Sequence, residues 1–338
     1  MKSPFRQVLV TGGAGYVGSA LVPMLLEDGL RVRVLDLELY GREALAGARG
    51  HAGLEEVIGD LRDAELVKRA VKGCDAVIHL ACISNDPSFE LNPGLGKSIN
   101  FDAFEPLVRL SREAGAKRFV YASSSSVYGV SDAPEVTEDH PLKPMTDYSK
   151  FKAQCEPILL GLAAPSFVPV IIRPATVCGW APRLRLDLVV NILTAHAYFN
   201  RKVKVFGGAQ TRPNIHISDM CDAYRQMLSL PDSSIAGETF NVGDENLTVA
   251  QLAELAREVV SRLAPDRGPI GLEVTPTDDN RSYKISSDKI LRKVGFKTRR
   301  TIRQAAESLV EAFQAGKVAD MMDPRYHNIR TMQASELA

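Results

Sequence analysis

A tyrosine and a lysine four residues apart, Tyr148 and Lys152, follow a run of four serines at residues 123–126. On a helix, residues four positions apart lie on one face about one turn apart, which would place the ammonium beside the phenol. A free phenol has a pKa of about 10, and a neighbouring cation stabilises its ionised form. Tyr148 is therefore a candidate general base toward a hydroxyl group. The same pattern is also typical of a solvated helix face after a polar loop.

A glycine-rich segment, TGGAGYVG at residues 11–18, gives this pair a context. Its glycines allow a tight turn between a strand and a helix, where backbone N–H groups can hold a pyrophosphate. The next strand ends in Asp36, whose carboxylate can accept both ribose hydroxyls and would repel a 2′-phosphate. Together these features predict a dinucleotide site that favours NAD over NADP, with Arg42 as the one nearby feature that favours NADP.

Short strand-like runs alternate with helical patterns over the first half of the chain, which predicts a parallel sheet covered on both faces. The expected strands are residues 7–11, 31–36, 55–58, 76–80, 118–122 and 168–173, and the expected helices include 16–27, 64–71 and 101–114. The segments that follow strands three and four, Asp60–Leu61 and Leu80–Ala81–Cys82, should lie at the sheet edge where the cofactor binds.

After residue 180 the pattern changes to helix 186–199, strand 203–206, helix 218–228, strand 239–242 and helices 249–263 and 302–315. The fold expected is α/β, a Rossmann-like doubly wound parallel sheet with a smaller C-terminal α/β substrate-binding lobe. Residues 1–180 would form the NAD-binding domain, and a strand and a helix from about residues 210–245 would return to it. Residues 181–330 would mainly form the substrate lobe. The last dozen residues are expected to be loosely held.

Composition limits the possible partners. Of the 338 residues 45% are hydrophobic, and Lys+Arg and Asp+Glu both number 41, so no overall field favours nucleic acid or an anionic membrane. Five scattered cysteines without C-x-x-C spacing argue against a disulfide framework or a zinc site and fit a cytoplasmic protein. No run of 18 apolar residues is present. These observations predict a cytoplasmic protein that binds neither membrane nor metal.

The ordered motifs carry a family resemblance. They are TGGAGYVG, GDLRD, HLAC, SSSSVYG, YSKFK, RPATVCG, RPNIHISD and DDNRSYKISSDKILRKVGF. In this order the chain resembles the extended short-chain dehydrogenase/reductase family, and within it the NAD-dependent nucleotide-sugar epimerases and dehydratases. The resemblance implies that Tyr148 is the catalytic acid and base, that Ser124 binds the same sugar hydroxyl, and that Lys152 also holds the nicotinamide ribose. It implies cofactor contacts from Gly12, Gly15, Tyr16, Val17, Asp36, Asp60, Leu61, Leu80, Ala81, Cys82, Asn100, Tyr148, Lys152, Pro174 and Val177.

The residues after Ser124 separate the possible reactions. By resemblance, sugar 4,6-dehydratases carry an acidic pair, or at least a glutamate, there, and a 3,5-epimerising relative carries a cysteine at the second position. Here those positions are Ser125 and Ser126, which disfavours both reactions. C4 epimerisation through a 4-keto sugar is the leading prediction. The alternatives are an NAD(P)-dependent nucleotide-sugar reductase, dehydrogenase or dehydratase of the same family. A non-catalytic NAD-binding regulator is the least favoured alternative.

The resemblance also predicts the substrate contacts and the assembly. Arg212 and Arg281 would hold the diphosphate through their guanidinium groups, and Ser124, Ser125, Ser126, Thr176 and Asn191 would line the sugar and base site. Thr176 stands where many relatives have asparagine. Arg183 and Arg185 add positive charge that would either bind a further phosphate or face water. A homodimer is expected, built from the helices at 101–114 and 148–162 paired with their mates.

Overall fold

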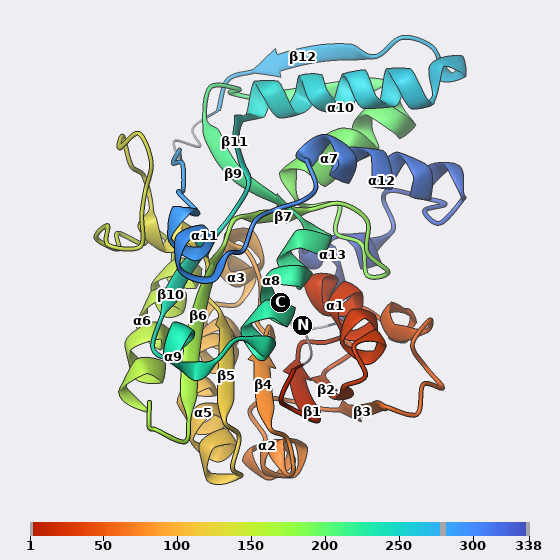
Figure 1. The fold of residues 1–338 in the computed structure, drawn as a ribbon. Helices are drawn as coiled ribbons and strands as arrows, with labels where there is room; N and C mark the ends of the chain where they lie inside the picture. Colours follow the sequence, from red (N-terminus) through yellow and green to blue (C-terminus); the bar gives the residue numbers. More distant parts are fainter. Residues whose placement is uncertain (1–2, 278–281, 336–338) are drawn as a thin grey trace.

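Seven parallel strands form the central sheet in the order β3-β2-β1-β4-β5-β6-β10 (Figure 1). The computed structural model describes residues 3–277 and 282–335. The strands are β1 (Gln7–Thr11), β2 (Arg31–Asp36), β3 (Leu54–Ile58), β4 (Ala76–His79), β5 (Arg118–Ala122), β6 (Val168–Pro174) and β10 (Thr239–Val242). The strand order reverses between β1 and β4, and in open α/β sheets ligands bind outside the carboxyl ends of the strands at this point. The Rossmann-like fold class predicted from the sequence is confirmed.

Alternate side chains of the central strands enter two separate cores. Val8 and Val10 of β1 pack on one face of the sheet, whereas Leu9 packs on the other. In β5, Val120 lies on the first face and Tyr121 on the second. Burial on both faces explains why these strands are continuously apolar instead of alternating with polar residues.

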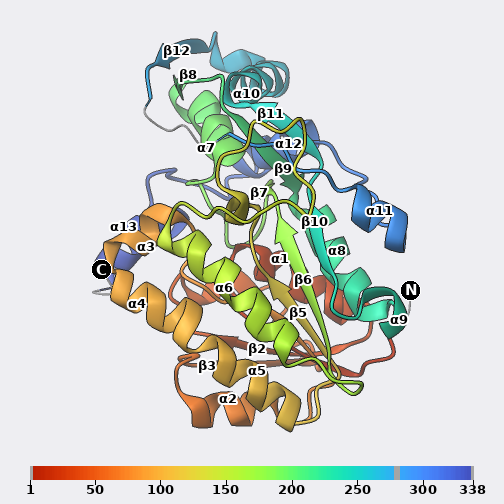
Figure 2. The same cartoon turned by 90° about the vertical axis from the view of Figure 1, so that its left-hand side faces the viewer.

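Helices cover both faces of the sheet (Figures 1 and 2). Helices α1 (Tyr16–Glu27) and α8 (Ile217–Ser229) pack together in the core on one face. Helices α2 (Ala64–Val71), α5 (Phe104–Glu113) and α6 (Asp147–Gly161) cover the other. Helix α6, which carries Tyr148 and Lys152, begins at a capping box in which Thr146 and Ser149 exchange hydrogen bonds.

A second group of elements lies beyond the carboxyl ends of the sheet (Figure 1). Its strands are β7 (Thr176–Cys178), β9 (Thr211–His216) and β11 (Glu245–Thr248) in one small sheet and β8 (Lys202–Phe206) and β12 (Gly271–Thr275) in another. Its helices α7 (Val189–Ala195), α10 (Val249–Leu263) and α12 (Ile302–Gln314) pack on one another. The remaining α-helices are short: α3 (Asp86–Leu91), α4 (Pro93–Lys97), α9 (Asp232–Ile235), α11 (Asp288–Val294) and α13 (Asn328–Ala334).

Some sequence-based boundaries and one expectation about order need correction. The helix expected at 101–114 is α5, which starts at Phe104 after a π-helical turn at Ser98–Asp102. The helix expected at 186–199 is α7, which starts at Val189 and is followed by a π-helical turn at His196–Asn200. The end of the chain is not loosely held up to residue 335, because α13 packs beside α3 and its Asn328 and Met332 are each only 1% exposed. The sequence could not show this, because Asn328 of α13 bonds to Ser84 and Arg183, more than 100 positions away.

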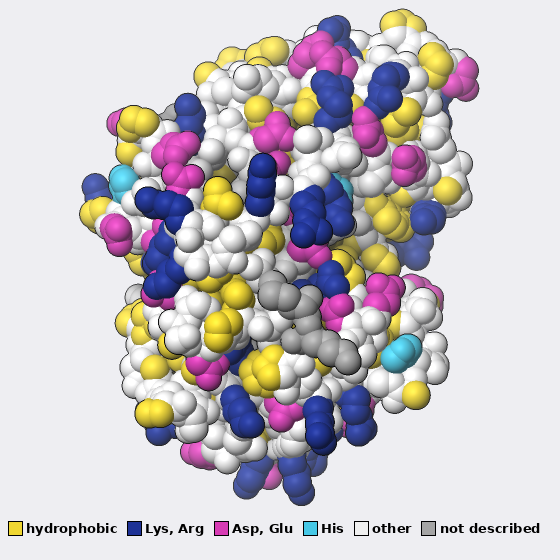
Figure 3. All heavy atoms as spheres, in the orientation of Figure 1, with side chains coloured by type: hydrophobic (Ala, Val, Ile, Leu, Met, Phe, Trp, Pro, Cys, Tyr) yellow, Lys and Arg dark blue, Asp and Glu magenta, His cyan; other side chains and the backbone are white. Residues whose placement is uncertain are grey.

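Within residues 3–277 and 282–335, no helix has the length and apolar character needed to cross a membrane. Figure 3 shows Lys, Arg, Asp and Glu side chains interspersed over one face of the molecule, in keeping with equal numbers of cationic and anionic residues.

Candidate active site

A cavity of about 840 Å³ lies along the carboxyl ends of the sheet strands and extends to the second group of elements. Its walls come from the glycine-rich turn after β1, the loops after β2 to β6, helix α6, and residues around α7, β8 and β9. Ligand cavities in proteins typically have volumes of about 300–1,000 Å³. The cavity is thus large enough for a dinucleotide site continuous with a substrate site.

Close packing within the protein requires glycine at two positions of the glycine-rich turn. Gly12 has φ +74°, and a Cβ atom there would lie 2.6 Å from the backbone nitrogen of Ala81. A Cβ atom at Gly18 would lie 2.4 Å from the carbonyl oxygen of Gly12. Helix α1 starts after Gly15, and no side chain among the described residues caps its first turn. The open N-terminus favours an anion such as a pyrophosphate.

Asp36 lies at the end of β2 beside this turn. Its carboxylate accepts hydrogen bonds from the backbone nitrogens of Ala14 and Glu38 at 2.9 and 2.8 Å. Burial raises the pKa of Asp36, and the two hydrogen bonds and the nearby Arg183 oppose this shift. Arg42, the cation that could have favoured a 2′-phosphate, is exposed and pairs with Glu38 at 2.9 Å. The geometry therefore fits a ribose contact by Asp36.

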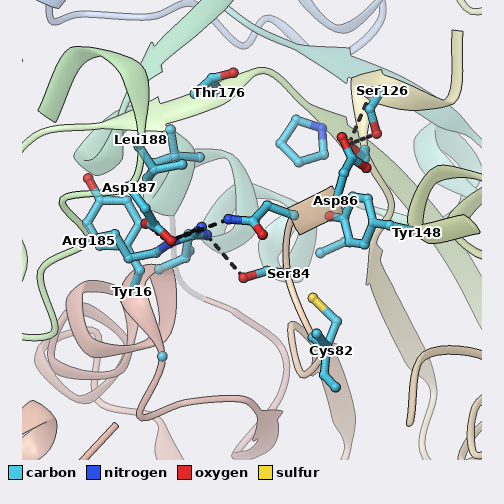
Figure 4. A pocket seen from close by; sticks show the side chains of 18 of the residues that line it. Tyr16, Cys82, Ser84, Asp86, Ser126, Tyr148, Thr176, Arg185, Asp187 and Leu188 are labelled. Carbon is cyan, nitrogen blue, oxygen red and sulfur yellow. Dashed lines mark hydrogen bonds and ion pairs between the residues drawn. The ribbon is translucent and has the colours of Figure 1, made fainter. Parts of the chain in front are cut away.

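Ser124, Tyr148 and Lys152 come together in the cavity from two elements. Ser124 follows β5 and its hydroxyl lies 2.8 Å from that of Ser126. Lys152 is 3% exposed, and its ammonium donates to the carbonyl oxygen of Ala122 at 2.7 Å. Figure 4 shows the Tyr148 ring near Asp86 and Ser126.

The phenol of Tyr148 is protonated at neutral pH in this structure. Burial raises its pKa well above 10, and the nearby Cys82 and Asp86 raise it further. Arg185 and a hydrogen bond with Ser124 lower it, but by less. The sequence predicts that Lys152 and the positively charged nicotinamide ring together lower this pKa, and the protein's own groups alone do not lower it. An ionised Tyr148 would need additional positive charge in the cavity.

A buried ion pair between Arg173 and Glu156 lies next to the serine loop and contacts it through Ser123. Arg173 binds Glu156 through two nitrogens at 3.0 and 2.6 Å, and both residues are almost completely buried. Ser123 donates to the same carboxylate at 2.6 Å. Because Glu156 lies one turn beyond Lys152 on α6, this network fixes α6 relative to β5 and β6.

Most of the residues predicted from the sequence line the cavity. They are Gly12, Gly15, Tyr16, Val17, Asp36, Asp60, Leu61, Leu80, Ala81, Cys82, Ser124, Ser125, Ser126, Tyr148, Lys152, Pro174, Thr176, Val177 and Arg212. Arg281 lies outside the described residues.

Asn100 and Asn191 are not among the described residues that line the cavity, and their contacts with cofactor and substrate remain predictions. Asn100 holds the backbone of Ile83 through two hydrogen bonds. Asn191 is fully buried, accepts from the nitrogen of Gly179, and donates to Tyr16 and Arg185. Their amides are used to position loops, which residue type and motif alone could not reveal.

Other cavity residues had little or no sequence signal. Arg183 and Arg185 were noted only as local charge, and Tyr40, Asp86 and Asp187 were not predicted at all. Arg185 binds Asp187 and Ser84, as Figure 4 shows. These residues come from loops that adjoin only in the folded chain.

A model of the NAD dependent epimerase/dehydratase family matches residues 8–243. The chain belongs to this family. It is therefore an enzyme of the epimerase/dehydratase type with NAD as its cofactor, which confirms the predicted family and cofactor. The uncapped N-terminus of α1 fits that cofactor.

Members of the family with known activities resemble the chain over most of its length. UDP-glucose 4-epimerase of Corynebacterium glutamicum is 29% identical over 313 residues, which are 86% of this chain and 90% of that protein. dTDP-glucose 4,6-dehydratase of Streptomyces griseus is 28% identical over 298 residues, 86% of this chain and 88% of that protein. The solved structure of MoeE5 in complex with UDP-glucuronic acid and NAD matches with a TM-score of 0.79 and 26% identity, covering 92% of this chain and 99% of that chain.

Proposed function

We propose that the chain is a nucleotide-sugar 4-epimerase that works through a transient 4-keto sugar. The observation that carries this proposal is that Ser124, Tyr148 and Lys152 line the same cavity as the glycine-rich turn. Bound NAD would supply the hydride acceptor and donor. Tyr148 would take the proton of the sugar 4-hydroxyl, with Ser124 bonded to the same oxygen, and would return the proton after the keto sugar had turned over.

The residues after Ser124 support epimerisation over elimination. Ser125 and Ser126 carry hydroxyl groups, which are neither strong acids nor strong bases at ordinary pH. Ser125 lies 3.1 Å from the hydroxyl of Tyr283, and Ser126 binds Ser124. Epimerisation at C4 needs only one proton shuttle, whereas removal of water across C5 and C6 needs a second acid and base.

The substrate's nucleotide end would lie in the second group of elements. Arg212 and Thr176 line that end of the cavity. A guanidinium can bind a diphosphate through parallel hydrogen bonds, so Arg212 is the proposed diphosphate contact. Arg281 remains a prediction for the same role.

One observation favours 4,6-elimination as a second candidate. Asp86 lines the cavity, raises the pKa of Tyr148 by its charge, and accepts a hydrogen bond from Thr146 at 2.6 Å. A carboxylate at that place could serve as the extra proton carrier. In that case Asp86→Asn would abolish turnover, whereas an epimerase would keep the reaction at C4.

Incubation with UDP-, GDP-, dTDP-, CDP- and ADP-sugars in D2O, followed by proton NMR, tests these candidates. Inversion at C4 with no deuterium on a ring carbon supports epimerisation by internal hydride return. Loss of the 6-hydroxyl with deuterium at C5 would support elimination. A lasting change in nicotinamide absorbance would instead indicate a net reductase or dehydrogenase.

We also propose a homodimer, formed through α5 and α6. These helices adjoin on one side of the molecule (Figure 2), where Leu110 and Ile158 are only partly buried. Pairing with a second copy would bury such side chains in a four-helix bundle. Light scattering should give twice the chain mass of 36.9 kDa, and a monomer mass would overturn the idea.

A further inference from the structure

Arg183 is a buried cation without a carboxylate partner in the described part of the chain. Its side chain lies in the cavity wall and the residue is 4% exposed. One guanidinium nitrogen, Nη2, donates to Oδ1 of Asn328, but Nε is buried and has no hydrogen-bond partner among residues 3–277 and 282–335. Burying an unpaired charge costs several kcal/mol by general estimates. Arg183 therefore has an unused hydrogen-bond donor and no direct ion pair among the described residues, so a bound anion could contact it.

Arg185, two residues further along the same loop, has the carboxylate partner that Arg183 lacks. It forms an ion pair with Asp187 at 2.9 Å and donates to the Ser84 hydroxyl at 3.1 Å. Arg185 is in direct contact with a carboxylate, whereas Arg183 forms no ion pair among residues 3–277 and 282–335 and is affected by Asp36 and Asp187 only at longer range. Burial also lowers the pKa of Arg183 to about 10, which still leaves the guanidinium charged at neutral pH.

The position of Arg183 indicates which anion it binds. Its backbone nitrogen donates to Ser19 of α1 at 3.1 Å, which ties its loop to the helix that follows the glycine-rich turn. Its guanidinium carbon lies 3.7 Å from the ring centre of Tyr40, in the loop after β2. Asp36 is close enough that each of the two charges shifts the other's pKa. Arg183 thus belongs to the adenosine end of the cofactor site.

The diphosphate is the only anionic part of NAD. A cation beside the turn that favours a pyrophosphate therefore matches the diphosphate, while the adjacent Asp36 would repel a 2′-phosphate. A guanidinium with one nitrogen already fixed by Asn328 keeps other donors for phosphate oxygens.

The C-terminal helix orients this arginine. Asn328, the first residue of α13, accepts from Arg183, donates to the Ser84 carbonyl and hydroxyl oxygens at 3.3 and 2.9 Å, and its backbone nitrogen donates to Asp187 at 3.3 Å. Asn328 is itself 1% exposed. A single amide thus joins the C-terminal helix to the loops that carry Arg183 and Ser84.

We propose that Arg183 binds the diphosphate of NAD and that Asn328 of α13 holds it in position, so that retention of the cofactor depends on the C-terminal helix. This inference concerns the cofactor alone and does not depend on which sugar reaction follows.

Arg183→Met tests the phosphate contact, with Arg42→Met as the matched control on an exposed arginine near the same loop. Calorimetry on the full chain would measure binding of NAD, ADP and adenosine, and also of NADP to Arg183→Met and the wild type. We expect Arg183→Met to weaken NAD and ADP about 10- to 100-fold, the range for a charge-assisted hydrogen bond, and to leave adenosine unchanged. Arg42→Met should change none of the three.

Two results would overturn the phosphate contact. One is unchanged binding of NAD and ADP in Arg183→Met. The other is a loss confined to NADP, which would mean that the guanidinium serves a 2′-phosphate. If Arg183→Met does not fold, Arg183→Lys provides the same comparison, because a lysine keeps the charge but not the planar fork.

Two variants of Asn328 test its orienting role. Asn328→Ala should weaken ADP severalfold, because the arginine is no longer fixed. Asn328→Asp keeps an acceptor for Arg183 but supplies the missing negative charge, so it should weaken ADP at least as much. If Asn328→Ala bound ADP like the wild type, Asn328 would not orient Arg183, and the proposed role would be wrong.

Discussion

The ammonium of Lys152 lies 5.9 Å from the ring centre of Tyr148, and both residues project from the first two turns of α6. Lys152 is anchored by the carbonyl oxygen of Ala122, the last residue of β5. This hydrogen bond joins α6 to the strand that precedes Ser124. The relative positions of the three proposed catalytic residues are therefore set by the fold before any ligand binds.

Replacing Tyr148 by phenylalanine removes the proposed acid and base while keeping the ring. Because general acid–base catalysis contributes about 10²- to 10⁴-fold, turnover should fall by at least that range. NAD content, measured after denaturing the purified protein, should not change. Tyr224→Phe is the control, since Tyr224 also lines the cavity but lies on α8. Equal turnover in Tyr148→Phe and the wild type would refute the assigned role.

Replacing Asp36 by alanine should change the cofactor preference. The carboxylate is positioned for ribose hydroxyls by the backbone nitrogens of Ala14 and Glu38. Its loss should weaken NAD by about 10-fold or more, the effect of losing hydrogen bonds to a charged group. NADP should be weakened less or bind better, because its 2′-phosphate is no longer repelled. Titrations with both cofactors measure this ratio, and an unchanged ratio would count against the ribose contact.

Replacing Glu156 by glutamine should destabilise the whole protein. Arg173 would then be a buried cation without its partner, and breaking a buried ion pair in this way costs about 3–5 kcal/mol. Urea unfolding would measure the loss. A double variant, Glu156→Leu with Arg173→Met, should recover part of it because no unpaired charge remains. A single variant as stable as the wild type would show that the pair contributes little.

Much of the fold could be predicted from local sequence. The strands β1, β2 and β5 and helix α10 were predicted with their observed boundaries, because apolar periodicity and turn residues mark them directly. The strands β7, β11 and β12 were not predicted, because their sequences lack the continuous apolar runs of the central strands and their pairing partners are distant segments.

The candidate site also contains residues that local sequence could predict and residues that it could not. Gly12, Asp36 and Tyr148 could be predicted to lie at one cavity because each is in a motif that directly follows a strand or begins a helix. Asn191 was predicted to contact the substrate, but its amide forms hydrogen bonds with the backbone of Gly179 and Arg185. The role of Arg183 depends on its lack of a direct ion pair among the described residues and on its contact with α13, and neither feature is visible from residue order.

His79 should make the protein sensitive to acid. Its ring is fully buried against Phe104 and Tyr121, its Nδ1 lies 2.7 Å from the Thr11 hydroxyl, and burial lowers its pKa to about 3. Between pH 6.5 and 3 the unfolded chain binds a proton that the folded chain does not, so the stability contributed by neutral His79 is present above about pH 6.5 and lost as pH falls. One such group should lower the free energy of unfolding by about 1.4 kcal/mol between pH 7.5 and 5.5.

His79→Phe isolates this contribution. The variant loses the contact with Thr11 at every pH, but its stability should fall less than that of the wild type on going from pH 7.5 to 5.5. His216, whose pKa burial lowers to about 4, adds the same sensitivity to both proteins and cancels from the comparison. Urea unfolding at the two pH values measures the difference. Identical losses in variant and wild type would mean that His79 is protonated at a similar pH in the folded and unfolded chains.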